Sequence, residues 1–177
     1  FKNSEVKAIV IAGPQMIPLP FLEDPKGFAK SLGVTVFDSD QIDSEQLIEL
    51  AAQVDVAVSV GCARLLKKRE LEAPRFGTFN LHPAELPKYR GKHPDLFAIM
   101  DGQSRVGVTL HRMDTGIDTG PIVAQLTEPV LTDDTIVTMT DKLYSRGAVL
   151  LSELLADLAN DSQIEQVSQA RRFDPLD

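Results

Sequence analysis

Short apolar segments alternate with amphipathic ones along the first half of this chain, and the alternation restricts the fold more than any other feature. Residues 6–12, 34–37 and 54–60 are brief, apolar and rich in β-branched side chains, as buried strands are. Asp24 and Asp43 stand where a helix N-cap is expected, ahead of the amphipathic segments that follow the first two strands. We therefore predict an α/β fold in which a mostly parallel, twisted sheet is flanked by helices.

The second half of the chain continues this pattern and then forms a long helix. Further strands are predicted at residues 75–82, 106–111 and 122–125, and a short helix at residues 94–100. From residue 136 to residue 158, apolar side chains recur every three or four positions, which is typical of a helix that packs one face on a sheet. The polar stretch that follows suggests one domain over residues 1–160 and a polar C-terminal tail over residues 161–177.

Composition and charge exclude several classes of protein. The 177 residues carry a formal net charge of −8, which argues against a nucleic-acid partner, since such binding requires an excess of lysine and arginine. No apolar run approaches the roughly 20 residues of a membrane span, and we identify no secretory signal. No P-loop and no Cys/His cluster with metal-ligand spacing occurs, so we expect no metal. The single cysteine, Cys62, allows no disulfide within the chain and so favours a reducing compartment, and we predict a cytoplasmic protein. We expect no membrane partner, and a homodimer stays open.

Asn80 and His82 form the pair most suggestive of chemistry. They alternate with Phe79 and Leu81 at the end of a predicted strand, so both polar side chains lie on one face, where open α/β sheets bind ligands. An amide can donate to a developing oxyanion and an imidazole can move protons near neutral pH, and acyl transfer needs both. The spacing alone is more typical of an asparagine that ends a strand and a histidine bonded to backbone.

Asp118 lies between Gly116 and Gly120, in a loop that joins two predicted strands. The glycines would free the backbone from the usual φ limits, as a loop built around one functional side chain requires. An ordinary turn explains the same residues, because aspartate and glycine are common in turns. The segment by itself therefore leaves a functional role and a turn role open.

The remaining histidines have simpler interpretations. His93 is expected to be a loop or helix-cap residue. His111 shares a predicted strand face with Thr109, and we expect it to pack beside the site rather than act in it.

These motifs occur in the order and at the spacing of one known family. The run NLHPAELPKYRG, residues 80–91, closely resembles the signature of the folate-dependent formyltransferases, which act on glycinamide ribonucleotide, amino sugars or methionyl-tRNA. The segments GVTLHRM and GIDTGPI, residues 107–113 and 116–122, resemble the second signature of that family. The resemblance is specific over residues 76–126, and it implies a Rossmann-like formyltransferase fold, with the catalytic domain over residues 1–160.

The resemblance also implies a function and a set of site residues. It implies an enzyme that moves a formyl group from 10-formyltetrahydrofolate to the primary amine of a small molecule, such as an amino-sugar nucleotide or glycinamide ribonucleotide. In the family pattern Asn80 and a protonated His82 stabilise the formyl oxygen, while Asp118 orients the histidine and helps to take the proton of the amine. The folate pocket of the family maps onto Ala63, Arg64, Leu65, Leu66, Met113, Asp114, Thr115 and Gly116.

Two features depart from the family pattern. Ala84 stands where the family has serine, and residues 6–12 correspond better to the second strand of the family than to its first. On that alignment the chain lacks the first βα unit, which helps to hold the amine; a rival alignment starts the fold at residues 11–14, and then a later strand and helix are missing. Two other functions therefore stay open: a formyltetrahydrofolate hydrolase with the same triad, and a non-catalytic domain that binds folate or a nucleotide.

Overall fold

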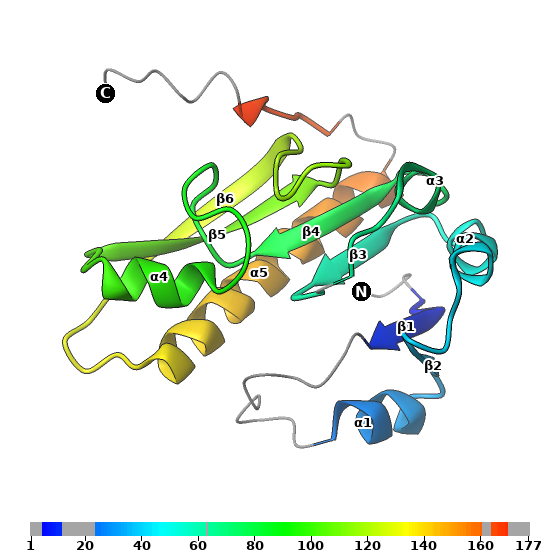
Figure 1. Ribbon diagram of the computed structural model, residues 1–177, viewed down its shortest axis with the longest axis horizontal. Helices are drawn as coiled ribbons and strands as arrows, with labels where there is room; N and C mark the ends of the chain where they lie inside the picture. The colour runs from blue at the N-terminus through cyan, green and yellow to red at the C-terminus, as the bar shows by residue number, and fades with distance from the viewer. Residues whose placement is uncertain (1–4, 12–23, 63, 161–163, 170–177) are drawn as a thin grey trace.

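The computed structural model describes residues 5–11, 24–62, 64–160 and 164–169, and Figure 1 shows how its elements are arranged. Its strands are β1 (Ala8–Ile11), β2 (Thr35–Asp38), β3 (Ala57–Val60), β4 (Thr78–His82), β5 (Arg105–Arg112) and β6 (Ile122–Pro129). Its helices are α1 (Pro25–Ser31), α2 (Ser44–Ala51), α3 (Lys68–Leu71), α4 (Pro94–Met100) and α5 (Ile136–Ala159). Each strand and helix predicted above corresponds to one of these elements, with ends that differ by a few residues.

The strands form two sheets, in which parallel and antiparallel pairs both occur. β1 and β2 pair in parallel as one sheet, and β3 and β4 pair in parallel within a four-stranded sheet of order β3-β4-β5-β6. β5 pairs antiparallel with both β4 and β6. The connection between β5 and β6 contains no helix, and strands joined without a crossover pair antiparallel. The α/β class with flanking helices is confirmed, while parallel pairing among the described strands is confined to β1–β2 and β3–β4.

Capping side chains start the first two helices where the sequence predicts. The Asp24 carboxylate accepts a hydrogen bond from the Gly27 N–H at 2.8 Å at the start of α1. Asp43 starts α2 with a capping box: its carboxylate accepts from the Gln46 N–H at 2.9 Å, and the Gln46 side chain accepts from the Asp43 N–H at 3.0 Å. These bonds satisfy N–H groups that have no partner inside a helix. His93 is the N-cap residue of α4, as expected.

The main core lies between α5 and the four-stranded sheet, because α5 crosses one face of that sheet (Figure 1). Its most buried members are Phe79, Leu81, Val108, Leu110, Met139, Leu143, Leu150 and Leu154. Gly147 permits the close approach of α5, since a Cβ there would lie 3.3 Å from Leu81 Cδ1. Side chains alternate along β4, so Asn80 and His82 are directed to the opposite face. Within the described residues, no helix combines the length and apolar character that crossing a bilayer requires.

Leu143→Ala tests the packing of α5 on the sheet. Leu143 is fully buried, so the substitution leaves a cavity, and we expect the free energy of unfolding to fall by about 2–5 kcal/mol. Val149→Ala is the matched control, because Val149 lies on the same helix with 45% of its surface exposed and should lower that free energy by roughly 0.5 kcal/mol or less. Urea denaturation measures both losses, and equal losses would contradict this packing.

Candidate active site

Two buried polar side chains project from β4 on the face that α5 does not cover. Asn80 and His82 are only 9% and 4% exposed. β5 runs antiparallel beside β4 and places His111 opposite Asn80 and Thr109 opposite His82. Directly opposite residues of an antiparallel pair share a face, so the predicted polar pair of β4 lies beside a second polar pair from β5.

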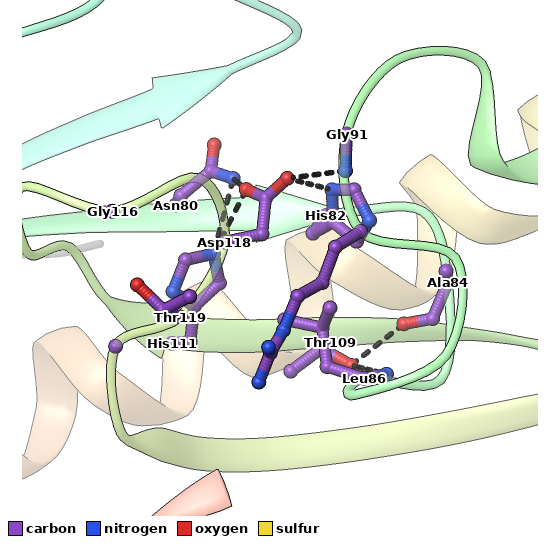
Figure 2. Close-up of polar contacts among 12 residues, drawn as sticks. Asn80, His82, Ala84, Leu86, Gly91, Thr109, His111, Gly116, Asp118 and Thr119 are labelled. Atoms are coloured by element: carbon purple, nitrogen blue, oxygen red, sulfur yellow. Dashed lines mark hydrogen bonds and ion pairs between the residues drawn. The ribbon is translucent and has the colours of Figure 1, made fainter.

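The connection between β5 and β6 (residues 113–121, the Asp118 loop) brings a carboxylate onto these side chains (Figure 2). Asp118 Oδ1 accepts a hydrogen bond from Asn80 Nδ2 at 3.2 Å, and Asp118 Oδ2 lies 3.5 Å from His82 Nδ1. The Gly91 N–H, in the loop after β4, donates to Asp118 Oδ2 at 2.9 Å. The structure brings Asn80, His82 and Asp118 together, and the carboxylate is the point at which they meet.

Close packing shapes the Asp118 loop more than glycine flexibility does. Asp118 itself has a left-handed backbone with a φ of 52°, whereas neither Gly116 nor Gly120 has a positive φ. A Cβ on Gly120 would lie 1.8 Å from the Arg112 carbonyl oxygen, and a Cβ on Gly116 would lie 2.0 Å from Thr119 Oγ1. The glycines are needed for space, so the expectation that they relieve φ was wrong. The uncommon φ falls on the carboxylate residue, and such outliers cluster at functional sites.

Both ring nitrogens of His82 face protein groups. Nε2 donates to the Tyr89 carbonyl oxygen at 2.8 Å, which places a proton on Nε2 and turns Nδ1 toward Asp118. Burial lowers the pKa of His82 below its usual 6.5, because it disfavours the charged imidazolium; the negative charge of Asp118 and the Tyr89 carbonyl oppose this in part. His82 is therefore mainly uncharged at neutral pH.

The Asp118 carboxylate stays ionised although it is partly buried. Burial by itself raises its pKa, but the contact with His111, the charge that His82 carries when it is protonated and the Gly91 N–H outweigh that effect, and the pKa lies below the usual 3.8. A carboxylate shared by several donors is a weak base, and it becomes a stronger one when a donor turns away.

Across the described parts of the chain, no group of His, Cys, Asp and Glu side chains is arranged to hold a metal ion.

His111 interacts with the site more directly than packing alone would require. It is 1% exposed, and its Nδ1 donates to the Arg112 carbonyl oxygen at 3.1 Å. Its Nε2 lies 3.2 Å from Asn80 Nδ2 and 3.5 Å from Asp118 Oδ1 (Figure 2). The sequence contained a signal for this contact, because polar residues alternate on β5 as they do on β4, but only the strand register sets them opposite each other.

The first folate segment predicted from the sequence follows β3. Ala63 lies outside the described residues. The Arg64 guanidinium donates to a backbone carbonyl of the loop before α2 at 3.0 Å and pairs with the buried Glu70 at 2.8 Å, so it braces the fold. Leu65 is 76% exposed and Leu66 is partly buried. Leu65 thus offers an apolar surface, whereas the Arg64 side chain is occupied by contacts within the fold.

The second predicted folate segment is the start of the Asp118 loop, which its own side chains hold in shape. The Met113 N–H donates to a carbonyl of β4 at 2.8 Å. Asp114 Oδ1 accepts hydrogen bonds from the Gly116 N–H at 3.0 Å and from Thr119 Oγ1 at 2.6 Å. Asp114, Thr115 and Gly116 are exposed and Met113 is partly buried.

Comparison with known proteins connects this site to one family. The sequence model described as formyl transferase matches residues 9–155. The chain belongs to the formyl transferase family. Methionyl-tRNA formyltransferase of Thermus thermophilus is 34% identical over 151 residues, which cover 84% of this chain and 50% of that protein. The chain spans about half the length of the curated relatives that it matches.

Solved formyltransferase structures share the fold. Phosphoribosylglycinamide formyltransferase from Streptococcus pneumoniae TIGR4 is 25% identical with a TM-score of 0.69, and the match covers 86% of this chain and 98% of that one. The formyltransferase PseJ from Anoxybacillus kamchatkensis, solved with UDP-4,6-dideoxy-4-formamido-L-AltNAc and tetrahydrofolate, is 27% identical with a TM-score of 0.65 over 92% of this chain and 81% of that one. The Rossmann-like formyltransferase fold implied by the sequence is confirmed.

Asp118→Asn tests the charge contact between Asp118 and His82. The variant keeps the shape, and asparagine tolerates a left-handed φ, but it removes the negative charge that raises the pKa of His82. We expect the pKa of His82, followed by NMR of its ring protons, to fall further below 6.5. Asp114→Asn, in the same loop, is the control and should leave that pKa unchanged. An unchanged pKa in Asp118→Asn would show that the contact is absent in solution.

Proposed function

We propose that this chain transfers a formyl group from 10-formyltetrahydrofolate to the primary amine of a small molecule. The observation that carries the proposal is the partly buried Asp118 carboxylate, 3.2 Å from Asn80 Nδ2 and 3.5 Å from His82 Nδ1. The site thus combines an amide donor, an imidazole and a carboxylate, which are the groups that acyl transfer to an amine uses. Membership of the formyl transferase family supports the same chemistry.

The proposed reaction exchanges one carbon–nitrogen bond for another. The amine nitrogen attacks the formyl carbon, the carbonyl oxygen becomes an oxyanion, and the bond between the formyl carbon and N10 of the folate then breaks. The amine loses one proton and N10 gains one, so the site holds a proton between the two steps. His82 is uncharged at neutral pH because burial lowers its pKa, so with Asp118 it can accept that proton, and the resulting imidazolium lies 3.5 Å from the carboxylate.

Asn80 supplies the hydrogen-bond donor for the oxyanion in this proposal. Its Nδ2 carries two hydrogens, and Asp118 Oδ1 and His111 Nε2 both lie 3.2 Å away. To reach a formyl oxygen, the amide exchanges one of these partners for the oxyanion. Loss of the bond to Asp118 would raise the pKa of the carboxylate as the amine gives up its proton.

The folate lies, in this proposal, between residues 64–66 and the start of the Asp118 loop. The exposed Leu65 provides an apolar surface for a planar ring, and the exposed residues Thr115 and Gly116 provide polar groups for its edge. The tetrahydrofolate in the PseJ crystal structure supports a folate as the donor.

An amine panel tests the reaction and the class of its acceptor. The protein is incubated with 10-formyltetrahydrofolate and, in separate arms, an amino-sugar nucleotide, glycinamide ribonucleotide, methionyl-tRNA or buffer alone. Mass spectrometry detects the formylated amine, and chromatography detects tetrahydrofolate. A formylated small molecule is the expected result. Tetrahydrofolate in buffer alone would indicate a hydrolase, formylation of the tRNA only would exclude a small-molecule acceptor, and no product in any arm would favour a binding domain.

Asn80→Ala tests the oxyanion role. We expect turnover to fall by roughly 100- to 1000-fold, because one oxyanion donor is lost, while the affinity for a non-reactive folate analogue changes little. Steady-state rates and calorimetry measure the two quantities. Asn160→Ala, at the exposed C-terminal end of α5, is the matched control and should keep full turnover. Wild-type turnover in Asn80→Ala would remove Asn80 from the chemistry.

A further inference from the structure

A buried glutamine near the end of the described chain reaches the back of the candidate site. Gln169 is 3% exposed, whereas Gln166 in the same short segment is exposed. The segment runs beside the start of β6, where Val167 and Ile122 exchange two backbone hydrogen bonds of 2.9 and 2.8 Å. A polar side chain buried from a polar segment must find partners inside the protein, since an unsatisfied amide is costly.

Every hydrogen-bonding group of the Gln169 amide has a partner. Nε2 donates to the carbonyl oxygens of Asp118 and Gly120, at 2.9 and 2.7 Å. Oε1 accepts from Arg90 Nε at 3.0 Å and also from Arg90 Nη2. An amide has two N–H donors and two acceptor lone pairs, so the side chain is fully used.

These partners belong to the two loops that meet at the Asp118 carboxylate. Asp118 and Gly120 lie in the Asp118 loop. Arg90 lies between Tyr89, whose carbonyl accepts from His82 Nε2 at 2.8 Å, and Gly91, whose N–H donates to Asp118 Oδ2 at 2.9 Å. One side chain therefore connects the loop that carries the carboxylate to the loop that fixes the imidazole.

We propose that Gln169 is a positioning residue, which holds the Asp118 carboxylate against Asn80 and His82 by linking these two loops. Asp118 has a φ of 52°, a conformation that residues other than glycine adopt only occasionally. The bonds to the carbonyls of Asp118 and Gly120 hold the backbone in that conformation from both sides of the turn. The kinetic consequences rest on the proposed formyl transfer, whereas the structural ones do not.

The ionisation of His82 reports on this positioning. Three charged or titratable side chains act on His82: Asp118, His111 and Asp95. Asp95 is held separately, by the Thr140 hydroxyl at 2.9 Å, and His111 is held by its own bond to a carbonyl of β5. Loss of Gln169 therefore loosens the Asp118 carboxylate and, through Arg90, the Tyr89 carbonyl; because both raise the pKa of His82, the pKa falls.

Gln169→Leu removes the four bonds while keeping a side chain of similar size. We expect kcat to fall by roughly 10- to 100-fold, because a small misplacement of a catalytic group has effects of that order, while KM for the folate stays close to wild type. The pKa of His82, measured by NMR, should fall in the same direction as in Asp118→Asn. Gln166→Leu is the matched control, since Gln166 is exposed in the same segment, and it should change neither kcat nor the pKa.

Arg90→Leu provides a second variant that keeps the proposal testable if Gln169→Leu does not fold. Arg90 is exposed, so its loss should be tolerated, yet it breaks the link between the loops and should lower kcat and the pKa of His82 in the same way. The double variant should be no worse than the more damaging single variant, because both act through one link. A normal kcat and a normal His82 pKa in a folded Gln169→Leu or Arg90→Leu protein would overturn the proposal. If wild type shows no formyl transfer, the NMR comparison still decides the role of Gln169.

Discussion

The contacts of one partly buried carboxylate organise this protein's candidate site. Asp118 accepts hydrogen bonds from Asn80 on β4 and from the backbone N–H of Gly91, and its Oδ2 lies 3.5 Å from His82 Nδ1. A carboxylate that leaves water must be surrounded by donors, since an unpaired charge is strongly disfavoured in a protein interior. The requirement to satisfy Asp118 therefore fixes where two loops and one strand lie relative to each other.

The same contacts set the resting protonation states. Burial lowers the pKa of His82, while the donors around Asp118 keep its pKa low, so a neutral imidazole faces an ionised carboxylate at neutral pH. Such a pair can hold one proton between two steps of a reaction, because the imidazolium that forms is stabilised by the charge already beside it. The chemistry proposed for this site follows from that imbalance between the two groups.

Local sequence predicted the elements of the fold well, and it predicted part of the site. The caps at Asp24 and Asp43, the short helix at residues 94–100 and the long helix near residue 136 all depend on nearby residues, and the structure contains each of them. Asn80 and His82 could be placed on one strand face because side chains alternate along a strand. Gln169 could not be recognised, because it lies in a polar stretch and its partners are far away in the sequence. Its contacts depend on the segment around Val167 lying beside the start of β6.

The sequence by itself determined the order of strands and helices and the apolar face of α5, because these depend on periodicity and on neighbouring residues. Its resemblance to the formyltransferase family indicated the three polar residues that meet in the site. Only the tertiary structure decided the antiparallel pairing of β5, which sets His111 opposite Asn80, and the left-handed backbone that points Asp118 inward. It also showed that Gly120 is needed for space beside the Arg112 carbonyl rather than for its own φ. The physical reason is that strand register and close contact between loops arise from packing between distant segments, and no local pattern encodes distances across the fold.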